Sequence, residues 1–256
     1  MAPGRLRAFA RVGVTIVLLV AGPSLLSGQE EAESIVSDRP GLGDGAHVIG
    51  RGVKQLEFGL DVSDAGPAKA FSIGQSLLRF GMGRWEARIL PGSAVISDGE
   101  SGLVDPAIGA KVRLNDAESA VQWSGVASAS LPLGSDGYTA DDVGLGGTLI
   151  AEGALSEDVA VAVNVGYGFF ADADAAGDGT LSVLVTPGFA IPSVDGLGAY
   201  AGWAGFFGAG SDRHVAEAGL AYSPDLDTQL DINVGVDVGD QADGWFFGVG
   251  IARRWR

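Results

Sequence analysis

The 256-residue sequence predicts an all-β fold, an antiparallel up-and-down transmembrane β-barrel of about 12 strands. Three observations predict this class. Apolar and polar residues alternate with a period of two through most of the chain. Glycine supplies 42 residues without a collagen period, which is typical of a folded chain rich in turns. Short connections alternate with longer acidic ones, as expected where turns lie at one rim and loops at the other.

Residues 1–28 have the pattern of a secretory signal peptide. Three arginines precede the nine apolar residues 12–20, and this stretch is too short to cross a bilayer as a helix. We therefore expect an exported protein whose signal is removed. An N-terminal membrane anchor is the alternative interpretation.

The composition excludes several classes of protein. After loss of the signal the chain would carry 13 basic and 32 acidic residues, a net charge of −19, which argues against a nucleic-acid-binding protein. The absence of cysteine excludes a disulfide scaffold, a thiolate zinc site and a cysteine nucleophile. With only two histidines, we expect no metal centre and no cofactor.

A polar, glycine-rich segment, residues 29–52, separates the signal from the predicted barrel at 53–256. We interpret it as a periplasmic or lumenal N-terminal segment that enters the barrel mouth. Asp38 and Arg39 would then pair with charges of the wall, because opposite charges in a restricted lumen form ion pairs. A flexible periplasmic leader is the alternative.

The strands of the first half follow from the alternation. The first places Leu56, Phe58, Leu60 and Val62 on one face. The second and third have an alternation broken by glycine or mixed faces, and ten strands result if both are excursions at the rim. The six predicted strands of this half lie near 53–62, 70–80, 84–91, 103–114, 119–131 and 142–153.

The second half shows the period more clearly. Leu230, Ile232, Val234, Val236 and Val238 alternate with aspartate, asparagine and glycine, which predicts a strand with one apolar and one polar face. The same pattern recurs in most of the other segments, although glycine and mixed faces weaken it at 197–207. The six strands predicted here lie near 158–170, 180–191, 197–207, 214–223, 228–238 and 245–255.

The two faces of the strands indicate a membrane barrel with lipid outside. Charges of both signs occur in mid-strand on the polar faces, as expected for a lumen, and aromatic residues lie near strand ends on the apolar faces, as expected for interfacial girdles. A secreted soluble β-sandwich is the alternative. The aromatic residues are Trp85, Tyr167, Phe169, Tyr222, Trp245, Phe247 and Trp255.

The polar faces supply the candidate lumen residues. Their side chains would set the selectivity of a pore, or they would form a neutralised salt-bridge network that stiffens a narrow barrel. The candidates are Glu57, Asp61, Glu86, Arg88, Asp105, Lys111, Arg113, Glu152, Glu217, Asp231 and Asp237.

Five stretches in order resemble the outer-membrane family named for the MetA pathway of phenol degradation. They are Ser37-Asp38-Arg39-Pro40, then 52–59, then Arg79-Phe80-Gly81 with 85–88, then 102–105 with 109–111, and finally 128–135. The resemblance implies an outer-membrane barrel that passes small hydrophobic or aromatic compounds. The chain departs from the usual aromatic C-terminus of such barrels, because Arg256 follows Trp255.

Three function hypotheses follow. The first is a passive channel for small solutes in the outer membrane, in contact with lipid and lipopolysaccharide, as a monomer or weak oligomer. The second is a closed structural or adhesive barrel. The third is an outer-membrane hydrolase, for which His214 is a better candidate than His47, although no serine stands at a suitable spacing. The acidic loops do not predict a specific calcium site, because the glycine and the terminal glutamate of a calcium-binding loop do not follow Asp172 and Asp174. The acidic loop residues are Asp136, Asp141, Asp142, Asp172, Asp174 and Asp178.

Overall fold

The computed structural model describes residues 34–65, 69–171, 179–208, 212–239 and 243–256. The predicted signal peptide and the acidic loop residues Asp172, Asp174 and Asp178 lie outside these ranges. Over the described ranges, no helix is long and apolar enough to cross a membrane.

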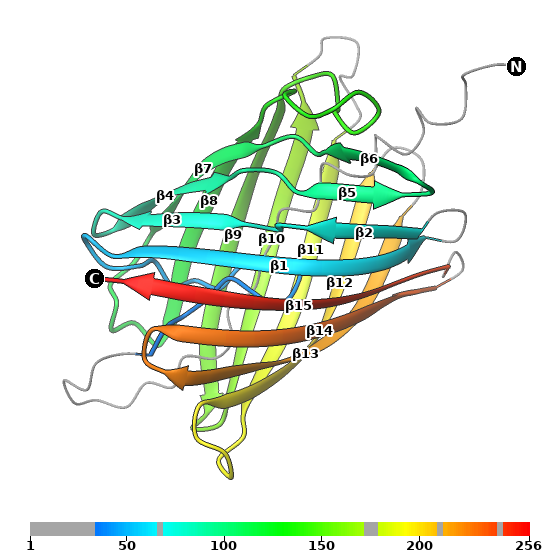
Figure 1. The fold of residues 1–256 in the computed structure, drawn as a ribbon. Helices are drawn as coiled ribbons and strands as arrows, with labels where there is room; N and C mark the ends of the chain where they lie inside the picture. Colours follow the sequence, from blue (N-terminus) through cyan, green and yellow to red (C-terminus); the bar gives the residue numbers. More distant parts are fainter. Residues whose placement is uncertain (1–33, 66–68, 172–178, 209–211, 240–242) are drawn as a thin grey trace, which may run out of the picture.

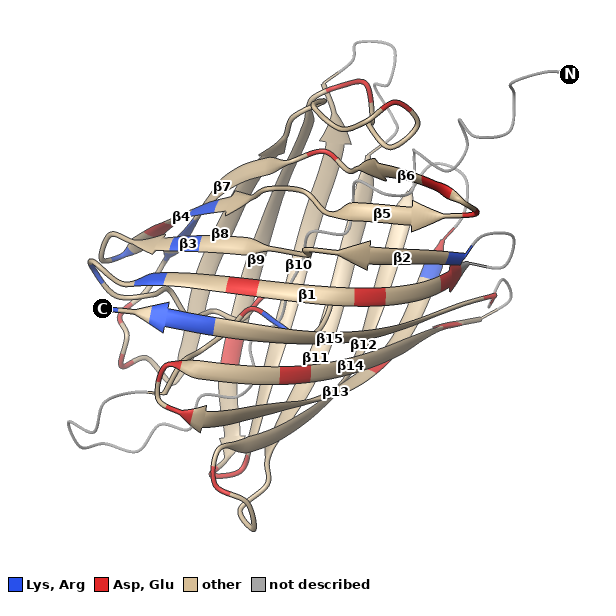
Figure 2. Cartoon of the chain, viewed as in Figure 1, with Lys and Arg blue, Asp and Glu red and all other residues tan. Residues whose placement is uncertain are grey.

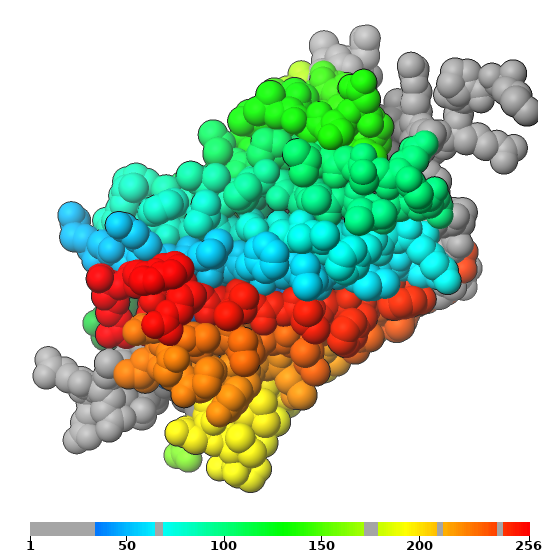
Figure 3. All heavy atoms as spheres, in the orientation of Figure 1, coloured from blue at the N-terminus to red at the C-terminus, as the bar shows by residue number. Residues whose placement is uncertain are grey.

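The described residues form one antiparallel sheet that closes into a barrel (Figure 1). The last strand pairs with the first over 12 residues, from Lys54 opposite Trp255 to Ala65 opposite Gly244. Figure 3 shows this junction as a continuous surface, with the red C-terminal strand beside the blue N-terminal one. The strands are β1 Lys54–Ala65, β2 Lys69–Ile73, β3 Leu77–Gly81, β4 Trp85–Leu90, β5 Ala94–Ser97, β6 Glu100–Leu103, β7 Ala107–Arg113, β8 Val121–Ser130, β9 Gly144–Ser156, β10 Val159–Phe170, β11 Thr180–Ala190, β12 Leu197–Gly208, β13 Arg213–Asp225, β14 Thr228–Val238 and β15 Gly244–Trp255.

The 15 strands form 12 segments that each run from one end of the barrel to the other, as predicted. Three of these segments are each divided into two strands. The divided pairs are β2 with β3, β4 with β5, and β6 with β7. The breaks at 74–76, 91–93 and 104–106 lie next to one another, and Val104 N–H still donates to the carbonyl of Ser93 at 3.0 Å across them. The two weakly alternating segments are therefore wall strands, and the ten-strand alternative is wrong.

One expected connection is wrong. The sequence predicted a loop over 91–101, but this stretch contains β5 and the start of β6, joined by a tight turn at Asp98 and Gly99. Both turn residues have positive φ angles, 52° and 85°, which is the backbone conformation that Gly favours and Asp tolerates. The signal at Pro91-Gly92 marks a break within one barrel crossing and not a turn.

The polarity of the wall is inverted relative to a soluble protein. On β14, Leu230, Ile232 and Val234 are 44–46% exposed, whereas Gln229 and Asp231 are at most 5% exposed. The seven aromatic residues predicted for the interfaces are all 40–53% exposed on the outside. An apolar exterior around a polar interior is the pattern of a barrel in lipid and contradicts the soluble sandwich.

The two ends of the barrel differ. The C-terminus lies at the same end as the turns at 82–84, 157–158 and 226–227 (Figure 1). The opposite end carries the 131–143 connection. Because short turns are periplasmic in outer-membrane barrels, we refer to the end with the C-terminus as the periplasmic end and to the other as the outer end.

Candidate functional site in the barrel lumen

The chain enters its own barrel before β1 begins. Ile35 N–H donates to the carbonyl of Leu226 at 2.8 Å in a periplasmic turn, and Gly52 N–H donates to the carbonyl of Gly81 at 2.9 Å on the way out. Between these points Asp38 and Asp44 are completely buried. We refer to residues 35–50 as the plug. Most of its residues are buried inside the barrel.

Asp38 is the main electrostatic anchor of the plug. Lys111 Nζ donates to both of its carboxylate oxygens at 2.9 and 3.0 Å, and Arg88 Nη1 donates at 2.6 Å. Arg79 Nη1 lies 3.4 Å away. Burial by itself would raise the pKa of Asp38, but the three cations hold it well below its usual range. Asp38 is therefore ionised, and it balances part of the positive charge of the wall.

Further ion pairs join this anchor to the wall. Arg79 donates to Glu86 at 2.8 and 2.9 Å and to Glu57 at 3.2 Å. Arg88 Nη2 donates to Asp44 at 2.9 Å. Every member is at most 3% exposed, so removal of one charge would weaken the compensation of its buried partners. We call this set the charge cluster; it consists of Asp38, Asp44, Glu57, Arg79, Glu86, Arg88 and Lys111.

Arg39 attaches the plug to the neighbouring part of the wall, formed by β1, β14 and β15. Its guanidinium donates to Asp231 at 3.2 Å and to Gln75 at 3.4 Å. It lies on Gly59 of β1 and Gly250 of β15, which are paired residues, and a Cβ atom at either position would overlap it. These two glycines therefore form a flat seat for the guanidinium at the junction of the first and last strands.

Acidic side chains of the wall also hold the backbone of the plug. Glu57 accepts from Asp38 N–H at 3.2 Å, and the other contacts are 2.7–3.1 Å long. The acceptors lie on four strands, so the plug is held around the circumference of the lumen. The other three donor–acceptor pairs are Leu42 with Glu217, Ala46 with Glu152, and Ile49 with Glu86.

The structure brings most of the predicted lumen residues to the plug. Seven contact it directly, and Asp61 lies on the same inner face of β1, farther toward the outer end. The remaining three lie elsewhere. Asp237 pairs with Arg213 at 2.7 Å near the outer rim, Arg113 ends β7 at the periplasmic side, and Asp105 accepts from Gly134 and Ala140 of an outer loop. The seven are Glu57, Glu86, Arg88, Lys111, Glu152, Glu217 and Asp231.

Sequence reasoning missed several residues of the site. Arg79 forms three ion pairs among the described residues, yet the broken alternation of its predicted strand did not indicate that its side chain faces the lumen. Asn164 both accepts from Asp44 N–H at 2.7 Å and donates to its carbonyl at 2.9 Å. A polar side chain among the glycine and alanine residues on the inner face of β10 was the available signal for Asn164.

An apolar patch also faces the lumen. Leu42 of the plug and Phe246 of β15 pack against a buried cluster on three neighbouring strands. Apolar side chains on an inner face depart from the polar lumen expected for a membrane barrel. We call this cluster the apolar patch; it consists of Leu184, Ala204, Phe206 and Val215.

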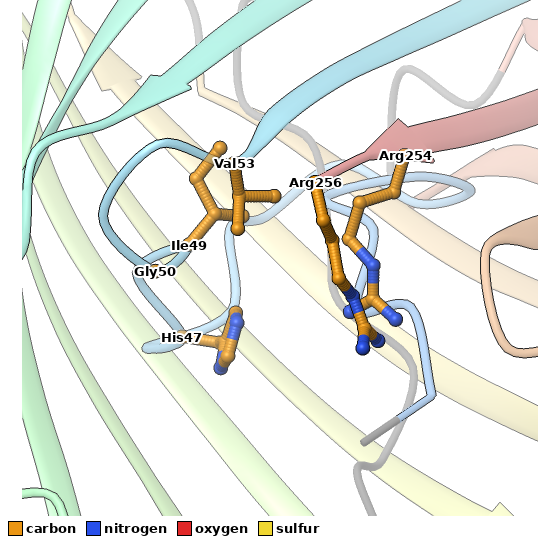
Figure 4. Close-up of a pocket in the computed structure, with 6 residues that line it drawn as sticks. All are labelled: His47, Ile49, Gly50, Val53, Arg254 and Arg256. Carbon is orange, nitrogen blue, oxygen red and sulfur yellow. The ribbon is translucent and has the colours of Figure 1, made fainter. Parts of the chain in front are cut away.

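A pocket of about 180 Å³ opens beside the plug at the periplasmic end (Figure 4). His47, Ile49 and Gly50 line it from the plug, and Arg254 and Arg256 line it from the end of β15. Burial, followed by the charges of Arg79 and Lys111, lowers the pKa of His47 to about 4. His47 is therefore neutral at physiological pH, and the arginines supply the positive charge of this mouth.

The hydrolase candidate His214 is placed on the lipid side of the wall. Its ring stacks on Trp203 with a centroid distance of 5.6 Å and meets Phe207 edge-on at 5.6 Å. Its neighbour Val215 points into the lumen and is completely buried. In the described part of the chain, no group of three or more His, Cys, Asp or Glu side chains is placed to hold a metal ion.

A closed barrel with a lipid-facing apolar exterior and a charged, plugged lumen defines an outer-membrane β-barrel protein. The chain belongs to the family described as "Putative MetA-pathway of phenol degradation", whose model matches residues 37–255. No curated protein sequence matches the chain.

Solved structures share this fold at low sequence identity. An outer membrane channel from Pseudomonas putida F1 superimposes with a TM-score of 0.65 and 13% identity, over 82% of this chain and 98% of that one. The KdgM porin gives a TM-score of 0.57 and 11% identity, over 79% and 99% of the two chains. The NanC porin gives a TM-score of 0.57 and 9% identity, over 77% of this chain and 98% of that one. These similarities agree with the 12-stranded barrel.

Proposed function

We propose that the protein is a passive outer-membrane channel for small solutes, including apolar or aromatic ones, whose path is narrowed by its own N-terminal segment. The observation that carries this proposal is the combination of a plug held by side-chain contacts and an apolar patch on the lumen wall. A barrel that served only as a scaffold would not need apolar side chains on its inner face.

The path that we propose has three parts. A solute enters past the acidic outer loops, contacts Leu42 and Phe246, which cover the apolar patch, and leaves by the periplasmic pocket at His47 and Arg254. Apolar contact favours solutes with a hydrophobic body because burial of apolar surface stabilises by about 25 cal/mol per Å². The family description, which refers to phenol degradation, agrees with a small aromatic solute.

A closed structural barrel is the second candidate. The charge cluster supports it, because its buried ion pairs connect Asp38 and Asp44 of the plug to β3, β4 and β7. The two candidates differ in whether the plug ever leaves room for a solute. We propose no enzymatic activity, since His214 lies among aromatic rings on the lipid side.

We propose lipid and lipopolysaccharide as the surroundings of the barrel, and a monomer or weak oligomer as its state. The exposed aliphatic side chains of the wall support the contact with lipid acyl chains. We propose no nucleic acid partner and no cofactor.

The experiment is conductance of the mature protein in a planar bilayer, together with uptake of a neutral phenol by proteoliposomes. A disulfide that fixes the plug tests its part. The chain has no cysteine, and a Cβ atom on Gly43 would lie 3.3 Å from Cγ of Asn164, which is close to the geometry a disulfide needs. We therefore choose the variant Gly43→Cys/Asn164→Cys.

We expect the oxidised double variant to conduct and to take up phenol more slowly than the same protein after reduction. Each single variant serves as a control for loss of the glycine or the amide. Equal transport in the oxidised and reduced states would show that plug movement does not limit the path. Absence of both conductance and uptake in folded wild-type protein would favour the closed structural barrel.

A further inference from the structure

The charges inside the barrel are unequal in number. Away from the two rims, the wall and the plug place eight carboxylates in the lumen against four cations. The cations are Arg39, Arg79, Arg88 and Lys111. The carboxylates are Asp38, Asp44, Glu57, Asp61, Glu86, Glu152, Glu217 and Asp231.

The cations are all engaged with carboxylates. Arg79, Arg88 and Lys111 belong to the charge cluster, and Arg39 pairs with Asp231. Figure 2 shows that basic residues gather towards the periplasmic ends of β1, β3, β4 and β15, whereas acidic residues extend along β1 and β14. A permeating anion therefore meets no uncompensated positive charge in the outer half of the described wall.

Three of these eight carboxylates have no ion pair within 4.0 Å among the described residues: Asp61, Glu152 and Glu217. Glu152 and Glu217 accept hydrogen bonds from plug N–H groups. Asp61 is different, because it is partly exposed in the lumen and lies on the outer side of the Arg39 seat. It is the carboxylate that a solute entering from outside would reach before the plug.

The surroundings of Asp61 offer further oxygen acceptors. Asp61 is paired with Gly248 of β15, and on the other side of this glycine the side chain of Asn233 reaches over it. The Asn233 Oδ1 and Asp231 Oδ2 atoms are buried and have no hydrogen-bond partner in the protein. The Asp231 side chain has no exposed area. Buried acceptors without a donor are costly, so this stretch of the wall favours a ligand that brings a donor or a positive charge.

We propose that Asp61 determines the charge selectivity of the lumen, so that neutral and cationic solutes pass and anionic ones are rejected. The proposal rests on the channel function proposed above and names the class of solute. A neutral phenol would pass, whereas a phenolate or an aromatic carboxylate would meet Asp61 with like charge. Asp61 acts here on the solute directly and requires no movement of the plug.

The test is the reversal potential of the full mature chain in a planar bilayer under a KCl gradient. This potential gives the ratio of the K⁺ permeability to the Cl⁻ permeability. We expect wild-type protein to prefer K⁺. Since one charge at a few ångströms in a hydrated lumen changes ion energies by about 1 kcal/mol, Asp61→Asn should lower the K⁺ to Cl⁻ permeability ratio by about fivefold, and Asp61→Lys should lower it further.

The matched control is Asp116→Asn, which removes the same charge from an exposed periplasmic turn and should leave the ratio unchanged. Single-channel conductance is recorded for each variant, because loss of Asp61 could instead act by loosening Arg39 and the plug. A large rise in conductance with an unchanged permeability ratio would overturn the proposal.

Failure of this inference differs from failure of the channel function. A conducting protein with the same permeability ratio in wild type and Asp61→Asn retains the channel but overturns the role of Asp61. A folded protein that neither conducts nor takes up phenol overturns both. Folding of each variant is checked by heat-modifiable mobility in detergent.

Discussion

The guanidinium of Arg39 lies against the α-carbon of Gly59, in space that any side chain at position 59 would occupy. Gly250, the partner of Gly59 on β15, borders the same space. The two glycines thus meet a steric requirement, since only a residue without Cβ leaves room for a planar group on the wall. The seat joins the plug to the strands that close the barrel.

Gly59→Ala should therefore displace Arg39 without unfolding the barrel. The methyl group overlaps the end of a flexible side chain, so the guanidinium can move away and lose its contacts with Asp231 and Gln75. A hydrogen bond to a charged group contributes about 1.5–3 kcal/mol. We expect hydrogen exchange of the plug amides to quicken by about tenfold to a hundredfold.

The control for this prediction is Gly125→Ala, on the lipid face of β8. A Cβ atom there makes contacts no shorter than 3.9 Å, so amide exchange in the plug should not change. If Gly59→Ala also leaves plug exchange at the wild-type rate, the guanidinium is not essential for docking.

Asp38 and Lys111 should show strong energetic coupling. Asp38→Asn leaves three cations around a neutral group and should weaken plug docking by about 3–5 kcal/mol. Lys111→Met leaves Asp38 paired with two arginines and should cost less. Because the two residues are in contact, the double variant should cost less than the sum of the singles by about 1–3 kcal/mol. Hydrogen exchange of residues 37–50 measures each value.

Asp225→Asn provides the comparison for the charge cluster. Asp225 pairs with Arg253 at 3.3 Å on the exposed periplasmic surface, where ion pairs contribute little, so plug exchange should stay at the wild-type rate. Strictly additive effects of Asp38→Asn and Lys111→Met would contradict direct coupling between them.

The wall could be predicted from the sequence because lipid and lumen impose opposite polarity on alternate residues. β14 and β15 show this best, with Ile232 and Phe247 outside and Asp231 and Gly248 inside. The hairpin of β5 and β6 escaped prediction because turn residues at Pro91-Gly92 also occur where a strand breaks. The residues at Pro91-Gly92 look the same in sequence whether the chain reverses there or only interrupts a strand. The difference depends on the pairing of β4 and β5 with their neighbours, which local sequence does not show.

The site was harder to predict than the wall. The plug has no periodic pattern, so its path follows from contacts with distant residues such as Asn164 and Glu217. Asp38 and Arg39 were identified as candidates for pairing with the wall, but their partners lie far away in the sequence. Arg39 and Asp231, for example, are 192 positions apart. Asp105 was assigned to the lumen from its strand, whereas the structure has it accept from loop amides.

Plug docking should depend on pH through two groups with opposite effects. Burial raises the pKa of Asp44 to about 6, although Arg88 beside it acts in the opposite direction. Its contribution to docking is present at low pH and is lost as pH rises from about 4 to 6. Burial lowers the pKa of His47 to about 4. Its contribution is present above pH 6.5 and is lost as pH falls towards 4.

The two effects should nearly cancel in the wild-type chain, and single variants should reveal them. In Asp44→Asn, docking should strengthen relative to the wild-type chain as pH rises from 4 to 6.5, because Asp44 no longer opposes the effect of His47. In His47→Gln, docking should weaken as pH rises over the same range, because the contribution of Asp44 is lost. Hydrogen exchange of the plug, corrected for the intrinsic pH dependence of exchange, measures both. Parallel pH profiles in the two variants would contradict the assignment.

Asp105 should hold an outer loop and not the path of the solute. Its two carboxylate oxygens accept from Gly134 N–H and Ala140 N–H, each at 2.8 Å, and Ser135 N–H donates to the carbonyl of Leu103 at 2.8 Å beside them. Asp105→Ala leaves both loop amides without this acceptor, at a cost of about 1–3 kcal/mol. We expect faster proteolysis within 131–143 on intact cells, with conductance and the K⁺ to Cl⁻ permeability ratio unchanged.

Asp142→Ala in the same connection is the control and should leave the rate of cleavage as in wild type. A change of permeability ratio in Asp105→Ala would instead place its charge on the solute path.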